Sequence, residues 1–323
     1  MGYPTTSELM TAIVEKGFYD SVAAAANERI YPSIAMTIPQ DKLVANYVSF
    51  GSVPEPTQLS GKSGAKLRES KELKDYKLTI TLLEWEDTID LPRVVLESNP
   101  AVGGQKAGQM GAKTNVFFDK RMFVQFGLNP NSYDTAAFFS TTHAESGSNQ
   151  INTQSTNIAA ASSPFTPTAA ELETSLTSLF AGLKGLTDDQ GTPVNEGVSR
   201  FTALIHPQFE WVFRQVTDPT MSAQSVDSSG ATGKFRGLVD VKVSAFCTAD
   251  GTTAGTVDRF YLVANNVATK PIALFTQVPW AVKTNIGTDS DAWNFDHLCL
   301  ITGYSIWEIG PWDWKTIFRQ VYT

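Results

Sequence analysis

The sequence predicts an α+β protein, and three observations support this fold class. Polar and apolar residues alternate from Tyr76 to Leu82, which is the pattern of a half-buried strand. Leucines recur at three- and four-residue spacing from Leu172 to Leu183, which is the pattern of an amphipathic helix. Short apolar or alternating runs follow that helix, so helices and strands are mixed along the second half of the chain.

The composition is that of a globular protein rather than a disordered one. Of the 323 residues, 42% are hydrophobic and 18% are charged, which suffices for one large domain or two packed subdomains. The net charge of −8 argues against a general nucleic-acid binder, which would need a basic face. No apolar stretch approaches the roughly 20 residues of a membrane span, and no signal-peptide pattern is visible. We therefore expect a soluble protein made in a cytoplasm.

The first part of the chain predicts two helices and a long extended ribbon. Residues 7–30 are expected to be helical, whereas two prolines predict irregular structure over residues 31–50. The apolar phase changes near Leu82–Leu83, so we expect a bulge there before the strand continues. A second helix is expected over residues 101–126, and its four glycines weaken its start by about 1 kcal/mol each relative to alanine.

A polar loop separates this part from a second subdomain. Residues 141–169 are nearly all Ser, Thr, Asn, Gln and Ala, which is typical of a surface loop. The helix after it begins with a capping-box pair, Thr168 and Glu171, and ends at Gly185. A buried strand, a helix that a proline opens, and three more strands are then expected, at residues 200–207, 207–216, 239–245, 260–264 and 272–278.

Residues 51–80 form a polar, positively charged segment in an otherwise acidic chain. Between positions 62 and 77, six basic side chains accompany three acidic ones, so this stretch carries a net charge of +3. It has no apolar anchor before Tyr76 and cannot bury enough surface against its own body to become ordered. It is therefore either disordered or held by another molecule. The basic residues that would make such a contact are Lys62, Lys66, Arg68, Lys71, Lys74 and Lys77.

No pattern in the sequence predicts a catalytic site. Ser140 and His143 lie in the polar loop, which is a poor place for a preorganised triad. The stretch GYSIW (303–307) has Trp307 where the tight turn of a nucleophile elbow requires glycine. The remaining histidines, His206 and His297, lie at a strand end and beside an aspartate.

Cofactor and metal sites are also not expected. Asp289, Asp291, Asp296 and His297 could hold a divalent cation, but their spacing matches no calcium loop and a solvated acidic turn is favoured. The glycines of residues 103–111 lack the Gly-Lys-Ser/Thr of a phosphate-binding loop. Two cysteines, Cys247 and Cys299, make neither a disulfide framework nor a zinc site. A structural role in an assembly is therefore favoured, with no catalytic, cofactor-binding or metal-binding residue.

Several segments in a shared order resemble the Mu-like major head subunit (gpT) family of tailed phages. YVSFGSVPEPTQLSGKSG (47–64) and KDYKLTITLLEWEDTIDLPR (74–93) resemble its extended loop and the ribbon that follows. The other segments are FFSTTH (138–143), FTALIHPQFEWVFRQV (201–216), FRGLVDVKVSAF (235–246), DRFYLVANN (258–266), KPIALFTQ (270–277) and GYSIWEIGPWDW (303–314). The resemblance covers most of residues 20–315. The sequence departs from the family in VVLESNP (94–100), where acidic residues are fewer, and in the polar composition of residues 141–169.

The resemblance implies the Hong Kong 97-type capsid fold, which has four parts. The expected parts are an N-terminal arm, an extended loop, a peripheral subdomain with a long helix, and an axial subdomain, followed by a return strand to the peripheral subdomain and the C-terminus. Their expected boundaries are 1–47, 48–82, 83–140, 141–296 and 297–323.

The resemblance also implies a function and partners. The chain would be a major capsid protein that self-assembles, as hexamers and pentamers, into the icosahedral shell enclosing the genome of a tailed phage or prophage. It would work with a separate scaffolding protein, a portal and a decoration protein, and would enclose double-stranded DNA without sequence-specific contacts. It would be assembled in the host bacterial cytoplasm and located in the virion capsid. The alternatives are an encapsulin-like nanocompartment shell, a phage tail or other virion protein, and a soluble hydrolase.

Overall fold

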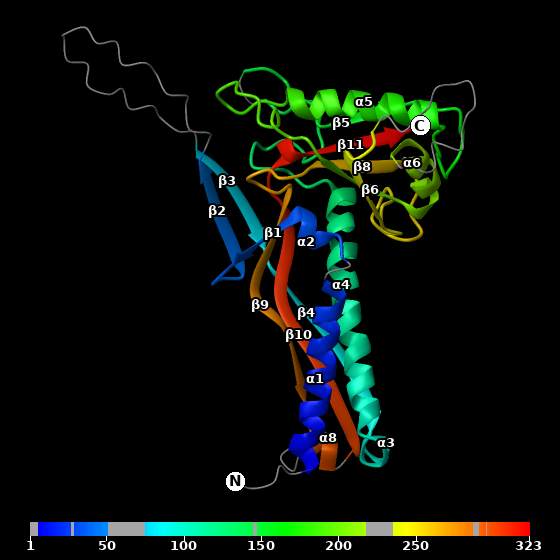
Figure 1. The fold of residues 1–323 in the computed structure, drawn as a ribbon. Helices are drawn as coiled ribbons and strands as arrows, with labels where there is room; N and C mark the ends of the chain where they lie inside the picture. The colour runs from blue at the N-terminus through cyan, green and yellow to red at the C-terminus, as the bar shows by residue number, and fades with distance from the viewer. Residues whose placement is uncertain are drawn as a thin grey trace, which may run out of the picture. The chain divides into compact units, whose positions relative to one another are not determined.

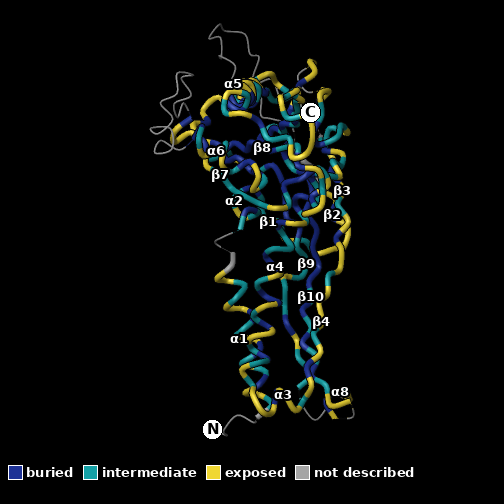
Figure 2. Tube along the Cα trace, turned by 90° about the vertical axis from the view of Figure 1, so that its right-hand side faces the viewer, coloured by how far each residue is buried: buried dark blue, intermediate teal, exposed yellow. Residues whose placement is uncertain are grey.

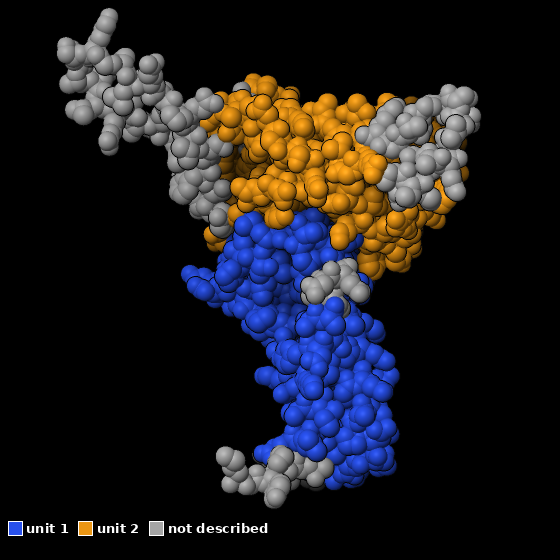
Figure 3. Space-filling model, viewed as in Figure 1, with its two compact units in different colours: residues 1–45, 80–125, 272–310 blue, residues 46–79, 126–271, 311–323 orange. Residues whose placement is uncertain are grey.

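A computed structural model describes most of the chain, and its mixture of helices and strands confirms the predicted α+β class. The described residues are 6–26, 29–50, 75–144, 147–217, 235–286, 291–294 and 296–323. The chain forms two compact units (Figures 1 and 3). Unit 1 consists of residues 1–45, 80–125 and 272–310, and unit 2 consists of residues 46–79, 126–271 and 311–323.

Unit 1 contains a four-stranded sheet in the order β1-β9-β10-β4. Strand β4 pairs antiparallel with β10 over ten residues, from Leu83 opposite Trp307 to Pro92 opposite Leu298. Strand β1 pairs parallel with β9, which places a segment near the N-terminus beside one near the C-terminus. The strand bounds are β1 Ala35–Pro39, β4 Leu83–Pro92, β9 Ile272–Thr284 and β10 Leu298–Pro311.

Two helices pack with this sheet to form the core of unit 1. Helix α1 (Thr6–Ala26) contributes Met10, Val14 and Phe18, which are at most 4% exposed. The long helix α4 (Ala101–Leu128) contributes Ala107 and Met110 to the same cluster. The sequence resemblance assigned residues 1–47 to an N-terminal arm. Within that range, helix α1 packs into the core of unit 1.

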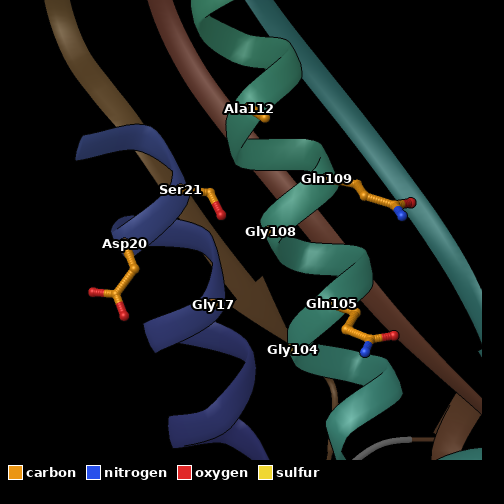
Figure 4. Close-up of a pocket in the computed structure, with 8 residues that line it drawn as sticks. All are labelled: Gly17, Asp20, Ser21, Gly104, Gln105, Gly108, Gln109 and Ala112. Carbon is orange, nitrogen blue, oxygen red and sulfur yellow. The ribbon is translucent and has the colours of Figure 1, made fainter. Parts of the chain in front are cut away.

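The glycines of α4 have a packing role that the sequence did not reveal. A side chain at Gly108 would meet Ser21 Oγ of α1 at 2.9 Å, and one at Gly111 would meet the Phe18 carbonyl oxygen at 2.5 Å. On the other helix, a side chain at Gly17 would collide with the main chain of Gly104. Figure 4 shows Gly17 of α1 alongside Gly104 and Gly108 of α4. The glycines thus permit a close helix contact, which compensates for their low helix propensity.

The prediction of irregular structure over residues 31–50 was wrong. This segment forms helix α2 (Tyr31–Ile34), strand β1 and strand β2 (Val44–Phe50). Pro32 occupies the first turn of α2, where its missing N–H is not needed. Pro39 is the last residue of β1, which lies at the edge of its sheet, so no interior ladder bond is lost.

Two polar side chains of α4 hold the N-terminal segment against this helix. Asn115 Nδ2 donates to the Val22 carbonyl oxygen at 2.8 Å, and Asn115 is 1% exposed. One turn later, Asp119 accepts main-chain hydrogen bonds from Tyr31 at 2.9 Å and from Ile30 at 3.2 Å. The two side chains therefore satisfy main-chain groups where the chain leaves α1 and enters α2.

Asp119 makes a pH-dependent contribution to stability whose sign can be tested. Burial raises the pKa of its carboxyl above the ordinary 3.8, although the hydrogen bonds from Tyr31 and Ile30 and the charge of Arg29 oppose this shift. The unfolded chain therefore releases this proton at a lower pH than the folded chain, and the ionised carboxylate costs stability as pH rises. We expect the wild type to lose free energy of unfolding relative to Asp119→Asn as pH rises above about 4. Urea unfolding of both proteins at several pH values measures this change, and a wild type that gains free energy of unfolding relative to Asp119→Asn as pH rises would contradict it.

Unit 2 contains a five-stranded sheet in the order β5-β11-β8-β6-β7. Its strands are β5 Thr153–Thr156, β6 Phe201–Ile205, β7 Val239–Val243, β8 Arg259–Ala264 and β11 Ile317–Tyr322. Strands β6 and β8, inside the sheet, are almost wholly buried. Helix α5 (Ala169–Gly185) packs over β11, with Gly182 against the Phe318 ring (Figure 1). The short helices η1 (Pro207–Phe209) and α6 (Glu210–Thr217) follow β6 as predicted.

The predicted start of α5 is confirmed. Thr168 Oγ1 accepts from the Glu171 main-chain N–H at 3.3 Å, and the Glu171 carboxylate accepts from the Thr168 N–H at 2.7 Å. These reciprocal bonds form the capping box. The Thr168 N–H holds the pKa of Glu171 below its usual value.

The compact units divide the chain differently from the expected boundaries. Strand β9, expected within 141–296, belongs to unit 1 because it pairs with β1. The last residues, expected to return to the peripheral subdomain, form β11 between β5 and β8 of unit 2. The remaining elements are strand β3 (Asp75–Thr81), helix α3 (Arg93–Ser98), helix α8 (Asp291–Asn294) and the turn η2 (Trp314–Thr316). Among the described residues, no helix combines the length and apolarity needed to cross a membrane.

Candidate assembly surfaces

The positively charged segment begins and ends in a two-stranded ribbon. Strands β2 and β3 pair with each other, and Thr79 Oγ1 donates to Asn46 Oδ1 at 3.0 Å across them. Lys77 is exposed on β3. The other five basic residues of the predicted contact lie outside the described residues, namely Lys62, Lys66, Arg68, Lys71 and Lys74.

Strand β4 of unit 1 carries an acidic surface. Glu84, Glu86, Asp87 and Asp90 are all exposed, and the strand contains no basic residue. Figure 2 shows exposed positions along β4. Within the described part of the chain, β4 is an edge strand that pairs only with β10. An edge strand presents unpaired main-chain N–H and C=O groups, so β4 offers both charge and hydrogen-bonding capacity to an extended partner.

A groove of about 330 Å³ opens beside the acidic strand within unit 1. Its apolar lining comes from Trp85 of β4, Trp280 of β9, and Met110 and Phe117 of α4. Gly303 of β10 lies against this lining, since a side chain there would meet the Met110 sulfur at 3.0 Å and the Trp280 ring at 3.3 Å. The rim of the groove carries acidic residues from the strand and basic residues from the helix, namely Glu86, Asp87, Lys113 and Lys120.

A partly buried ion pair supports one wall of the groove. Glu308 is 5% exposed and accepts from Arg121 Nε at 2.9 Å and from an Arg121 terminal nitrogen at 2.7 Å. The Arg121 guanidinium lies over the Trp85 ring, 5.4 Å from its centroid. The indole N–H of Trp85 donates to the Trp307 carbonyl oxygen at 3.0 Å. The orientation of Trp85 is therefore fixed from two sides, which preorganises the aromatic lining.

These features suit a basic, extended polypeptide. Exposed carboxylates can pair with lysine and arginine, although each exposed pair contributes only about 0–1 kcal/mol. Indole and phenyl faces can add cation–π contacts and bury the methylene stems of the same side chains.

His143, a candidate for a catalytic triad, has a structural environment instead. The expectation of a surface loop was wrong at this position, because His143 is fully buried. Its Nδ1 lies 2.6 Å from Asp134 Oδ2, and its Nε2 lies 3.3 Å from Asn152 Oδ1. Its ring stacks on Trp314 with centroids 3.8 Å apart and an angle of 2°. Both ring nitrogens are thus engaged, and the Ser140 hydroxyl is bonded to Thr142 rather than to His143.

The other candidate catalytic residues are not brought together. His206 belongs to unit 2, and its Nδ1 accepts from the Gln208 N–H at the start of η1. His297 is exposed in unit 1 and has a positive φ of 53°, which is typical of a turn. Ser305, in the elbow-like stretch, lies within strand β10, is buried, and donates to the Val278 carbonyl oxygen.

The candidate cation ligands also have no common site in the described residues. Asp289 lies outside them, whereas Asp291 and Asp296 are exposed. No group of three potential metal ligands occurs among the residues that the structure describes. Cys247 and Cys299 are free and buried, and burial raises the pKa of Cys299 to about 11. These thiols therefore lack the lowered pKa of a reactive cysteine.

The acidic strand and the aromatic groove are features that the sequence did not single out. The groove joins residues that are far apart in the sequence, from Trp85 to Trp280. The available signal was the run of acidic residues after Leu83 without a single base before Arg93.

A comparison with protein families supplies the identification. The family model described as the Mu-like prophage major head subunit gpT matches residues 8–168. This match spans α1, the ribbon, the acidic strand β4 and α4. The chain belongs to this family. A comparison of the head subunit with curated proteins finds no match.

The head subunit also shares its fold with solved phage capsid structures. The capsid structure of cyanophage P-SCSP1u has 12% identity and a TM-score of 0.62, over 91% of this chain and 88% of that chain. The capsid of a native GTA particle has 12% identity and a TM-score of 0.55, over 100% and 92% of the two chains. The bacteriophage JBD30 capsid has 13% identity and a TM-score of 0.52, over 98% and 73%. At these identities the likeness shows the fold, which is the expected Hong Kong 97-type capsid fold.

Proposed function

We propose that this head subunit self-assembles in many copies into the icosahedral shell that encloses the genome of a tailed phage or prophage. The observation that carries this proposal is the match to the major head subunit family over residues 8–168. The capsid fold shared with P-SCSP1u, the GTA particle and JBD30 supports it. Copies gather as hexamers and pentamers, and the role of the protein is structural rather than enzymatic.

The positively charged segment joins neighbouring copies in this proposal. Lys62, Lys66, Arg68, Lys71, Lys74 and Lys77 contact the acidic strand β4 and the groove of an adjacent subunit. The opposite charges of the segment and the strand support this assignment. Each ion pair is weak, at about 0–1 kcal/mol, but every subunit in a closed shell is held by several neighbours at once. Weak single contacts also let a misplaced subunit dissociate before closure.

The remaining partners follow from the role of a shell. A separate scaffolding protein guides assembly, a portal occupies one vertex, and a decoration protein is a further candidate partner. Double-stranded DNA lies inside without sequence-specific contacts, and the net charge of −8 disfavours tight binding of the genome to the shell. Assembly takes place in the host bacterial cytoplasm, and the product is the virion capsid.

Particle formation tests the proposed function. The full chain is expressed with and without the other head proteins of the same phage or prophage, and the products are separated by sedimentation and imaged by electron microscopy. We expect closed icosahedral particles in at least one of these preparations. Tubes, small cages filled with cargo protein, or a subunit that remains monomeric at high concentration in all preparations would overturn the proposal.

A further inference from the structure

A series of aromatic and cation–π contacts connects the loop end of the β2–β3 ribbon to the interior of unit 2. Its first contact joins Tyr76 of β3 to Tyr133, with ring centroids 5.0 Å apart and an angle of 59°. Tyr76 is the first residue of the positively charged segment whose side chain the structure describes. The contact therefore acts at the end of β3 that follows residues 51–74.

Lys315 forms the next part of this series. Its Nζ donates to the Tyr133 hydroxyl at 2.6 Å and lies 5.1 Å from the centroid of the same ring. The ammonium also lies 5.5 Å from the Trp314 ring centroid, and the Lys315 side chain is only 13% exposed. A partly desolvated cation between two aromatic rings makes directional contacts, so its position is more restrained than that of a surface lysine.

The other end of the series is anchored in the core. Trp314 is fully buried and stacks on His143, which is also fully buried. His143 pairs with Asp134 at 2.6 Å, and Asp134 is the residue next to Tyr133 in the chain. The contacts Tyr76–Tyr133–Lys315–Trp314–His143, called the stacked column below, thus return to the loop that presents Tyr133.

That loop has a tightly defined backbone. Thr135 has a φ of 67°, which is uncommon for a residue with a branched side chain and persists only where the surroundings hold it. The Ser132 N–H donates to the Ala136 carbonyl oxygen at 2.8 Å, and the Thr135 N–H donates to the Ser132 carbonyl oxygen at 3.1 Å. Tyr133 is therefore presented to the ribbon from a fixed turn.

We propose that the stacked column is a positioning device that fixes the angle at which the β2–β3 ribbon presents the positively charged segment. The inference rests on the proposed function, because the ribbon carries the segment that joins neighbouring copies. A ribbon held at one angle delivers that segment to one place on the neighbour and thereby restricts the curvature of the shell. A ribbon that varied in angle would permit several curvatures, and particles of mixed size would result.

The direct test is a distance measurement within the unassembled full-length subunit. Spin labels are attached to Lys77→Cys on β3 and Ala181→Cys on α5, two exposed positions of unit 2. The natural cysteines, Cys247 and Cys299, are fully buried, so the labels react at the introduced positions. Double electron–electron resonance then gives the distribution of distances between the ribbon and α5.

The column is weakened by Lys315→Met, which removes the ammonium, and by Tyr133→Leu, which removes the ring. We expect each variant to broaden the distance distribution at least twofold. Lys242→Met on β7 and Tyr19→Leu on α1 are matched controls that remove the same groups elsewhere, and they should keep the wild-type width. Circular dichroism and thermal unfolding establish that each variant is folded, and Tyr133→Phe replaces Tyr133→Leu if the latter is not.

Wild-type width in every folded column variant would overturn the inference, because the column would then be packing without influence on the ribbon. Assembly of the unlabelled variants gives a second measurement, for which we expect a wider spread of particle diameters than for the wild type. The distances are measured without assembly and so are independent of the proposed function. If the column variants broaden the distance distribution but the wild type never forms shells, the positioning role is supported and the proposed shell function is rejected.

Discussion

Replacing Lys62, Lys66, Arg68, Lys71 and Lys74 together with glutamate is expected to abolish shell assembly and leave the subunit folded. The substitutions convert the charged segment from net positive to strongly negative. Under the proposed function, the segment would then repel the acidic strand β4 of a neighbour instead of attracting it. Each substitution removes an attraction of about 0–1 kcal/mol and introduces a repulsion of similar size. The five substitutions together therefore weaken the binding free energy of each contact between subunits by several kcal/mol. In the proposed shell each subunit makes this contact with a neighbour, so the loss would recur throughout the shell.

The expected result is a folded, unassembled subunit in sedimentation velocity. The matched control reverses five exposed bases elsewhere, namely Lys16, Lys42, Lys184, Arg236 and Lys283. It changes the net charge by the same amount, so we expect it to retain more particles than the segment variant. Wild-type particle yield from the segment variant would contradict a role for these residues between copies.

A charge exchange tests whether strand β4 of the neighbour is the surface that binds the positively charged segment. Glu84, Glu86, Asp87 and Asp90 are replaced with lysine in the same chain as the five glutamates of the segment, which restores opposite charges in exchanged positions. We expect this variant to recover particles that neither set of substitutions forms alone. Recovery of particles would not occur if the segment bound a surface other than β4. If the exchanged variant is folded but forms no particles, the segment binds elsewhere on the neighbour.

Substituting Gly17 is expected to cause the largest loss of folding stability. A side chain at this position meets the Gly104 main chain, including its carbonyl carbon at 2.9 Å, and a backbone cannot yield as a flexible side chain can. The two helices must then separate around Val14 and Phe18, both of which are fully buried. We expect Gly17→Ala to lower the free energy of unfolding by about 2–3 kcal/mol and Gly17→Leu to prevent folding of unit 1.

The control for this prediction is Gly185→Ala at the end of α5. A side chain there would meet nothing within 4 Å, and alanine is favoured over glycine in a helix by up to about 1 kcal/mol. Urea unfolding of the two alanine variants and the wild type provides the comparison. Equal midpoints for Gly17→Ala and Gly185→Ala would show that the helix contact is looser than the structure indicates.

Local patterns in the sequence predicted the elements whose cause is local. The capping box at Thr168 and Glu171 and the leucine stripe after it place α5 correctly, because both depend on residues a few positions apart. The change of apolar phase at Leu82–Leu83 coincides with the break between β3 and β4. The family resemblance, carried by several short segments in one order, supplied the capsid fold and role.

Features that depend on tertiary contacts were not predictable from local patterns. The glycines of α4 lower the helix propensity of their segment, and only the approach of α1 explains their presence. The polar residues around His143 suggested an unstructured loop, yet Asp134 and Asn152 satisfy the ring nitrogens and Trp314 stacks on the ring. The groove beside β4 requires the pairing of strands that are some 200 residues apart, so no window of the sequence contains it.

A reconstruction of assembled wild-type particles by electron cryomicroscopy tests most directly whether the positively charged segment joins one subunit to the next. We predict density for residues 51–74 that leaves one subunit at its ribbon and lies along the acidic strand β4 of another. Density that follows the segment back onto the surface of its own subunit, in a closed shell, would contradict this account.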